Sequence, residues 1–334
     1  MKIVVLHGEV SGEAGKDEQD VLVQVEAVSH ALSELGYDPV IVPLSMNLTE
    51  MVARVQAIRP ALVFNLVESL TGRGRLIHIA PSVMDSLKIP YTGSGTEAIF
   101  LTSHKLLAKK ILQANGIATP PWLALEEISA DSPLEGPYII KSVWEDASIG
   151  LDEDSIVFAK DVGHLRQEMI ARLGKLGGDC FAEVFIEGRE FNISLLAGEN
   201  GPEVLPPAEI RFDDYPPGKN RVVGYRAKWD EDSFEYHHTP RCFDFSREDE
   251  ALLRDLVELS RRCWGLFHLR GYARVDFRVD QASVPWVLEI NANPCLSPGS
   301  GFVAAAAQSG LEFNRIIERI IKNAGEQMVY NYLA

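Results

Sequence analysis

Apolar residues in the first 100 positions follow two alternating spacings. Short continuous apolar runs, typical of buried strands, are separated by segments whose apolar residues recur every three or four positions, typical of helices. The pattern predicts strands at 2–7, 39–43 and 61–66 and helices at 21–35, 49–58 and 76–87. This order indicates a parallel, doubly wound sheet with its ligand edge at the carboxyl ends of the strands. The loops after His7 and Asn65 are therefore expected to face a site.

The pattern changes after residue 100. A helix is predicted at 103–116, where Gly116 and the breaker at 119–121 end it. A small α+β segment follows, with strands at 137–142 and 180–186. The remainder reads as an antiparallel portion with a final helix at 312–324. The expected fold class is therefore α/β combined with α+β.

Residues 271–280 and 284–294 read as the two strands of a hairpin. If the turn is centred between residues 282 and 283, Asp276 lies opposite Glu289 and Arg274 lies opposite Asn291. Side chains alternate along strands, so these four polar residues share one face. The other face is expected to be core and carries Val275, Phe277, Leu288 and Ile290.

The polar face of this hairpin is rich in oxygen atoms. Carboxylates opposed across a strand pair, about 5 Å apart, repel one another unless a positive charge lies between them. Asp, Glu and Asn oxygens suit Mg²⁺, which commonly takes its other ligands from water and substrate phosphates. The alternative is a solvated polar face on which Arg274 is only an ion-pair partner, and spacing alone does not separate the two.

Composition narrows the class of protein. The chain has 334 residues and is 46% hydrophobic, enough for two or three domains with real cores. A net charge of -16 argues against a nucleic-acid partner or an anionic membrane surface. No run approaches the roughly 18 apolar residues of a membrane span, and the N-terminus has no signal-peptide layout, so a cytoplasmic protein is expected. The four cysteines lack CxxC spacing and indicate neither zinc nor a disulfide framework.

Three isolated features carry weaker signals. Lys141 ends an apolar strand before the small-residue turn 146–150, and could meet phosphate oxygens, although a surface lysine is the commoner case. Residues 183–190 could place acidic groups near an adenine and ribose, and a solvated strand end is the alternative. His237 and His238 point to opposite sides if extended, so a loop role is favoured over metal binding.

Taken together, these pieces resemble the ATP-grasp superfamily, and within it the D-alanine–D-alanine ligase branch, over essentially the full chain. The matching stretches are 89–94, 103–105, 118–121, 139–141, 183–191, 224–228, 271–277 and 288–294. The resemblance implies three domains: a Rossmann-like substrate domain at 1–100, a central lid at 101–186 and a C-terminal domain with the magnesium site at 187–334.

The resemblance implies a nucleotide site made by Lys105, Lys141, Ser148, Glu183, Ile186 and Glu190. In it the two lysines contact the ATP phosphates. The carboxylate of Glu183 meets the adenine amino group, the backbone of Ile186 meets the adenine ring, and Glu190 meets the ribose.

The resemblance also implies Mg²⁺, expected as two ions with Mn²⁺ as a substitute. Their ligands match Asp276, Glu289 and Asn291. Arg274 matches the family's oxyanion-stabilising arginine, and Lys228 matches a phosphate-contacting lysine on a mobile loop.

Positions that face the amino-acid substrates depart from the family pattern. Asp20, Trp229 and Ser300 match substrate-contacting positions, with aspartate in place of glutamate and tryptophan in place of tyrosine. Ala147 falls where the ligases carry a serine that fixes the first substrate. The family's His-Gly segment is replaced by residues 65–75.

The family's oxyanion glycine aligns with Cys295. Nucleotide and metal positions are thus kept while the positions facing the amino acids differ. A substrate preference other than that of an ordinary D-alanine–D-alanine ligase is therefore expected.

The implied reaction forms an amide or peptide bond through an acylphosphate, which a closing loop at 213–239 keeps from water. Small amino-acid or peptide-like molecules are the expected partners, and a homodimer is left open. Two alternatives remain. One is a regulatory protein that binds ATP without catalysis. The other is a ligase for substrates other than D-alanine.

Overall fold

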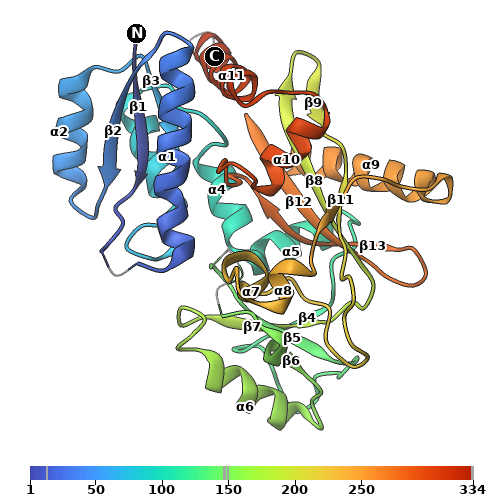
Figure 1. Ribbon diagram of the computed structural model, residues 1–334. Coiled ribbons are helices and arrows are strands. Elements are labelled where there is room, and N and C mark those ends of the chain that lie inside the picture. The colour runs from blue at the N-terminus through green and yellow to red at the C-terminus, as the bar shows by residue number, and fades with distance from the viewer. Residues whose placement is uncertain (13, 146–147, 149, 332–334) are drawn as a thin grey trace.

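The computed structural model describes residues 1–12, 14–145, 148 and 150–331, and places them around three β-sheets (Figure 1). Each sheet is built from one of the three expected stretches of chain. The division at residues 100 and 186 stays a prediction, because helix α5 (Lys105–Ala114) belongs to the expected central stretch but packs on the C-terminal sheet.

The N-terminal sheet is parallel, as the alternation of strands and helices predicts. Its strand order is β2 (Asp38–Leu44), β1 (Lys2–Gly8) and β3 (Leu62–Asn65). Helix α1 (Lys16–Glu34) covers the face that carries Ile3 and Val5. Helices α2 (Leu48–Ile58) and α3 (Ile79–Leu87) cover the face that carries Val4 and Leu6. Both faces are therefore buried, which confirms the doubly wound arrangement.

The central sheet is small and antiparallel. Its order is β4 (Trp122–Ala124), β7 (Cys180–Val184), β5 (Tyr138–Ser142) and β6 (Ile156–Val157), with helix α6 (Val162–Arg172) on one face. This sheet and α6 form the lower part of the molecule in Figure 1. Ile186, which was expected within a strand, lies just beyond the end of β7.

The C-terminal sheet has six antiparallel strands. The order is β11 (Arg241–Cys242), β10 (Ala208–Ile210), β8 (Arg189–Gly198), β12 (Tyr272–Val279) and β13 (Pro285–Asn291), and β9 (Gly201–Val204) pairs with β8. The described residues also form short 3₁₀ turns at Gly74–Leu76, Glu153–Ser155 and Arg247–Asp249.

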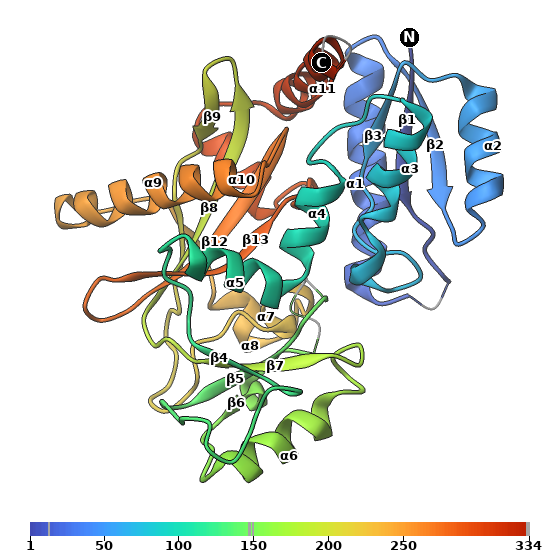
Figure 2. The same cartoon turned by 180° about the vertical axis from the view of Figure 1, so that it is seen from behind.

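The two faces of the C-terminal sheet meet different partners. One face packs against α4 (Thr96–Ser103), α5 and α9 (Glu250–Leu266); α4 and α5 lie along the sheet in Figure 2. On the other face α10 (Gly301–Gln308) and α11 (Phe313–Asn331) share a core with α1 and β3. This shared core fixes the N-terminal sheet beside the C-terminal one.

The hairpin of β12 and β13 has the expected register at one end and an irregularity in the middle. Arg274 pairs with Asn291 and Asp276 with Glu289, but Phe277 pairs with Val287. The expectation that Leu288 lies on the core face is wrong, because Leu288 is the extra residue of this β-bulge. Val287 takes the core position, and Leu288 lines a cavity on the opposite side.

Helix boundaries differ from the periodic pattern where local capping decides them. The helix expected at 103–116 is two helices, because His104 is extended and its Nδ1 accepts a hydrogen bond from the Leu107 main-chain N–H at 3.2 Å. This cap starts α5 and separates it from α4. Helix α1 begins at Lys16 rather than residue 21, with Asp17 and Glu18 in its first turn, where acidic groups are favoured.

Two short helices, α7 (Tyr225–Trp229) and α8 (Phe234–His237), lie between the C-terminal and central sheets (Figures 1 and 2). Within the described residues, no helix combines the length and apolar character needed to cross a bilayer.

Candidate functional site

One cavity of about 1180 Å³ brings together the residues singled out in the sequence. Its wall includes parts of all three sheet units and of the loop after β1, as the strand order predicts. The candidate residues that line it are Asp20, Lys105, Lys141, Ser148, Glu183, Ile186, Glu190, Lys228, Trp229, Arg274, Asp276, Glu289, Asn291 and Ser300. Their roles stay predictions, but their convergence on one cavity is a property of the fold.

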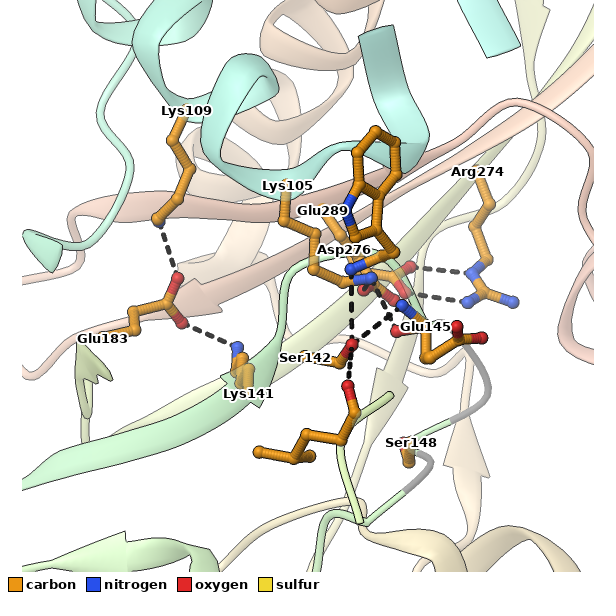
Figure 3. A network of polar contacts seen from close by, with 12 residues as sticks. Lys105, Lys109, Lys141, Ser142, Glu145, Ser148, Glu183, Arg274, Asp276 and Glu289 are labelled. Atoms are coloured by element: carbon orange, nitrogen blue, oxygen red, sulfur yellow. Dashed lines mark hydrogen bonds and ion pairs between the residues drawn. The ribbon is translucent and has the colours of Figure 1, made fainter. Parts of the chain in front are cut away.

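Arg274 neutralises the first of the opposed carboxylates. Its Nε donates to Asp276 Oδ1 at 2.7 Å and its Nη2 donates to Oδ2 at 2.8 Å, a bidentate pair (Figure 3). Asn192 on β8 adds a donor, with Nδ2 at 2.8 Å from Asp276 Oδ1. The bidentate contact orients the Arg274 guanidinium along the wall of the cavity. Asn192 was not identified from sequence, because its strand lies far from the hairpin along the chain.

Glu289, the second carboxylate, faces positive charge from another part of the chain. Lys105 Nζ lies 3.9 Å from Glu289 Oε2 and donates at 2.8 Å to the main-chain oxygen of Glu145. Burial alone would raise the pKa of Glu289, but the nearby charges of Lys105, Lys228 and Arg274 lower it to about 2. Glu289 is therefore an anion at neutral pH and is available to a cation.

A buried charge cluster lies at the other end of the cavity. Lys141 Nζ lies 2.6 Å from Glu183 Oε1, and Lys109 Nζ lies 2.6 Å from Glu183 Oε2 (Figure 3). Burial would raise the pKa of Glu183, but the two ammonium groups outweigh burial and lower it. Glu183 is thus held as a carboxylate with one lysine on each oxygen.

Lys109 is absent from the residues identified from sequence. It lies one turn after Lys105 on α5, and its side chain is 1% exposed. The sequence does hold one signal for Lys109, which is its position on the predicted helix. It lies beside Ala108 and Leu112, which are buried. A lysine on a buried face needs a partner, and only the fold shows that the partner is Glu183.

Glu190 begins the polar wall beyond this cluster. Arg278 Nη2 lies 2.8 Å from Glu190 Oε2, and the Arg278 guanidinium lies 5.3 Å from the Phe185 ring centroid. Phe185 and Ile186 line the same part of the cavity, which therefore combines apolar surface with a buried ion pair. Arg278 was not identified from sequence, although it alternates along β12 with Arg274 and Asp276 on the same polar face.

The expected closing loop, residues 213–239, lies over the cavity. It contacts the central part of the chain through Ser148 and the N-terminal part through α1. Ser148 Oγ donates to the Val223 main-chain oxygen at 2.9 Å, and the Tyr225 hydroxyl donates to Asp17 Oδ1 on α1 at 3.0 Å. Lys228 and Trp229 follow on α7 and line the cavity. Burial lowers the pKa of Lys228.

The end of the cavity near Asp20 is formed by α1 and the chain before α10. Asp20 Oδ2 accepts hydrogen bonds from Ser297 Oγ at 2.8 Å and from Cys295 Sγ at 3.0 Å. Ser300 Oγ donates to the Cys295 main-chain oxygen at 2.9 Å. Burial, with Glu68 and Asp20 nearby, raises the pKa of the Cys295 thiol. The thiol therefore lines the cavity in its neutral form and is a poor nucleophile. Ala147 lies outside the described residues.

Arg241 adds positive charge at this end and was not identified from sequence. Its Nη1 donates to the Gly299 main-chain oxygen at 2.6 Å. Burial and the charge of Arg274 lower the pKa of Arg241. Arg241 lines the same cavity as Arg274 and adds a second guanidinium to its wall.

Residues 65–75 join the N-terminal and central sheets with their helices. The main-chain N–H of Gly74 donates to Glu145 Oε2 at 2.9 Å, and the Arg75 guanidinium lies 5.4 Å from the Trp144 ring centroid. Glu68 lines the cavity and accepts a hydrogen bond from Gln24 Nε2 at 2.7 Å. The segment therefore lines the cavity through Glu68 and contacts the central part of the chain through Gly74 and Arg75.

The donor set at the hairpin fits a hard cation. Among the residues that the structure describes, no three His, Cys, Asp or Glu side chains gather as a metal site. Asp276, Glu289 and Asn291 offer two carboxylates and one amide on neighbouring positions of β12 and β13. Mg²⁺ accepts such a partial set, because it commonly keeps waters and takes phosphate oxygens as further ligands.

The sequence is similar to those of known ligases. Residues 111–322 match the family model described as "D-ala D-ala ligase C-terminus". The chain is 31% identical over 336 residues to the D-alanine–D-alanine ligase of Carboxydothermus hydrogenoformans, covering 96% of this chain and 97% of that protein. It is 30% identical over 337 residues to the corresponding ligase of Moorella thermoacetica, covering 98% and 100%.

A solved structure shares the fold. The D-alanine–D-alanine ligase from Bacillus anthracis complexed with ATP superposes with a TM-score of 0.71 at 22% identity, covering 99% of each chain. The likeness extends over all three sheet units and hence over every segment that forms the cavity.

Proposed function

The chain belongs to the D-alanine–D-alanine ligase family, and on this premise we propose that it joins a carboxylate to an amine with ATP as the energy source. It is an ATP-dependent enzyme that forms C–N bonds. The observation that carries the proposal is the face of the hairpin. Asp276 and Glu289 lie opposed there, with Arg274 and Lys105 against them, and all four line one cavity.

The nucleotide is proposed to lie between the central sheet and the hairpin. Lys105 and Lys141 would contact the phosphates as charged donors, with Lys228 and Ser148 reaching them from the closing loop and the facing turn. Glu183 and the backbone of Ile186 would meet the adenine, and Glu190 the ribose. The position of these groups along a single wall supports this orientation.

Mg²⁺ is proposed to be held by Asp276, Glu289 and Asn291, with two ions and Mn²⁺ as a substitute. When bound, the metal neutralises phosphate charge and orients the transferring phosphoryl group. The protein's own contribution is to keep Glu289 ionised and to present oxygen atoms from adjacent strands.

The proposed reaction has two steps, phosphoryl transfer to the carboxylate and then attack of the amine. A substrate carboxylate oxygen attacks the γ-phosphorus of ATP, the bond to ADP breaks, and an acylphosphate forms. The amine nitrogen then attacks the acyl carbon, loses a proton, and inorganic phosphate leaves. Arg274 would stabilise the oxyanion of the tetrahedral intermediate, an interaction often worth about 3 kcal/mol or more for one donor.

Exclusion of water is proposed as the role of the loop at 213–239. An acylphosphate hydrolyses if water reaches it, so closure must precede phosphoryl transfer. The contacts of Tyr225 with Asp17 and of Ser148 with Val223 support this role, because they join the loop to both opposing units.

The substrates are proposed to be amino acids or small peptides, held at the end of the cavity formed by Asp20, Trp229 and Ser300. The carboxylate of Asp20 on α1 would meet the substrate ammonium, and Arg241 would meet a substrate carboxylate. The curated relatives are named for D-alanine. Because Trp229 stands where the family has tyrosine and carries only an N–H donor, we propose that a different or bulkier partner is preferred.

The deciding experiment measures phosphate release from ATP and Mg²⁺ with D-amino acids, L-amino acids and dipeptides in pairs, with product masses. A single amide product above background identifies the ligase and its substrates. D-alanyl-D-alanine as the best product would overturn the altered preference. Binding of ATP with no product from any pair would favour a regulatory protein.

The division into domains at residues 100 and 186, a cytoplasmic location and a homodimer stay predictions.

A further inference from the structure

Lys109 is a buried charge that the proposed chemistry does not use. Its ammonium lies 2.6 Å from Glu183 Oε2, donates to Thr119 Oγ1 at 2.7 Å and lies 5.3 Å from the Trp122 ring centroid. Its side chain is 1% exposed and takes no part in the cavity wall. Lys109 therefore cannot reach a ligand directly, and any role must act through Glu183.

The two lysines on Glu183 are not equivalent. Lys141 is 14% exposed and lines the cavity next to the last residue of β5, so a nucleotide phosphate can recruit it. Lys109 is fixed on α5 from behind by Thr119 and Trp122. When phosphates draw Lys141 away from the carboxylate, Lys109 is the partner that stays.

We propose that Lys109 is a positioning residue that keeps Glu183 a carboxylate in the nucleotide complex, and thereby selects a purine with an amino group at C6. The inference rests on the proposed function, in which Glu183 meets the adenine. Lys109 itself touches neither the nucleotide nor the reacting atoms.

Selection follows from hydrogen-bond chemistry. A carboxylate only accepts hydrogen bonds, whereas a carboxylic acid also donates one. Adenine presents an amino donor at its C6 position, and hypoxanthine and guanine present a carbonyl acceptor there. A carboxylate therefore favours adenine. A buried Glu183 without Lys109 would favour its neutral form, which can donate to the carbonyl.

The test compares binding of non-hydrolysable analogues of ATP and ITP to wild type and to Lys109→Met. A hydrogen bond to a charged group is worth about 1.5–3 kcal/mol, so affinity for the ATP analogue should fall roughly tenfold to hundredfold. Affinity for the ITP analogue should fall less or rise. The shift in the ratio of the two affinities is the signature, because a general loss of structure would weaken both equally.

Lys110→Met is the matched control. Lys110 is the next residue on α5, is 53% exposed, and pairs with Glu127 at 3.2 Å on the surface. It removes the same charge from the same helix and should leave both affinities unchanged. If Lys109→Met does not fold, Lys109→Gln supplies a neutral hydrogen-bonding side chain for the same measurement.

A double mutant separates positioning from packing. In Glu183→Gln the group at the purine is already neutral, so adding Lys109→Met should not change the analogue ratio further. An additional shift in the double mutant, or an unchanged ratio in the single one, would overturn the inference. Wild-type protein that binds no ATP analogue would instead refute the proposed function.

Discussion

At the scale of single residues, the charged side chains of the cavity meet partners from other parts of the protein. Asp276 has Arg274 and Asn192, Glu183 has two lysines, and Glu289 faces Lys105. Such arrangements are costly to break, because removing one partner leaves a buried charge uncompensated, typically at about 3–5 kcal/mol. The charges are therefore fixed before any ligand arrives.

Asp276→Asn together with Glu289→Gln is expected to reduce ATP turnover by at least about a hundredfold, because the proposed metal site loses both anionic ligands. The fold should be retained, since the core face of the hairpin is unchanged. A phosphate assay and circular dichroism measure both. Asp255→Asn with Glu258→Gln, two exposed residues of α9, is the matched control. Full turnover in the first variant would refute the metal assignment.

Glu183 should make the stability of the protein depend on pH in a defined direction. Its folded-state pKa lies below the ordinary value of 4.5, so its stabilising contribution is full above that pH and is lost as pH falls through the folded value. The difference in unfolding free energy between wild type and Glu183→Gln should therefore shrink on acidification. Urea titrations at about pH 6 and about pH 3.5 measure it. A constant difference would contradict the expectation.

Sequence reasoning reached the residues that lie on one hairpin or match a family motif. It missed Asn192, Lys109 and Arg241, whose partners are distant along the chain. The sign of a charge and its helical face are readable from sequence. Which opposite charge it meets depends on how sheets pack, and neither spacing nor composition determines that.

At the scale of elements, a hydrogen bond between α7 and α1 joins two parts of the molecule. The Tyr225 hydroxyl lies on α7 and Asp17 lies in the first turn of α1. A hydrogen bond to a carboxylate is stronger than one between neutral groups. This contact ties the loop at 213–239 to α1.

Tyr225→Phe is expected to uncouple ATP hydrolysis from product formation. Loss of this bond, at about 0.5–1.5 kcal/mol, should increase phosphate released per product roughly threefold to tenfold, because water reaches the acylphosphate. Phosphate and product are measured in the same reaction. Asp17→Asn should have a similar, smaller effect, and the two changes should not add. Unchanged coupling in Tyr225→Phe would remove this contact from the closing mechanism.

Element boundaries show where periodicity stops being informative. The apolar pattern correctly predicts the strands and helices of the N-terminal sheet, because burial on both faces imposes it. It runs α4 and α5 together, because the break depends on the conformation of His104 alone. It does not reveal the bulge at Leu288, since one extra residue leaves the sequence pattern nearly unchanged.

At the scale of the whole molecule, the cavity depends on the N-terminal and central units lying against each other. Their contact includes the Gly74 N–H and the side chain of Glu145, with Arg75 beside Trp144. A Cβ atom on Gly74 would lie 2.7 Å from the Trp144 main-chain oxygen. The contact therefore requires a residue without a side chain at position 74.

Gly74→Ala is expected to lower kcat/KM roughly tenfold or more while each unit stays folded, because the backbone contact cannot close. Steady-state kinetics with circular dichroism separate the two effects. Gly174→Ala is the matched control, because a Cβ atom there would meet nothing within 4 Å. Equal activity of the two variants would show that the closed contact is not needed for turnover.

The bulge at Leu288 has a consequence for changes in chain length. A deletion inside a strand normally turns every following side chain to the wrong face. Here Val287 already faces the core and Glu289 already faces the cavity on either side of the extra residue. Loss of Leu288 would leave a regular ladder with both orientations kept. Evolution could therefore remove one codon at this point of β13 without changing which side chains of the strand face the core and which face the cavity.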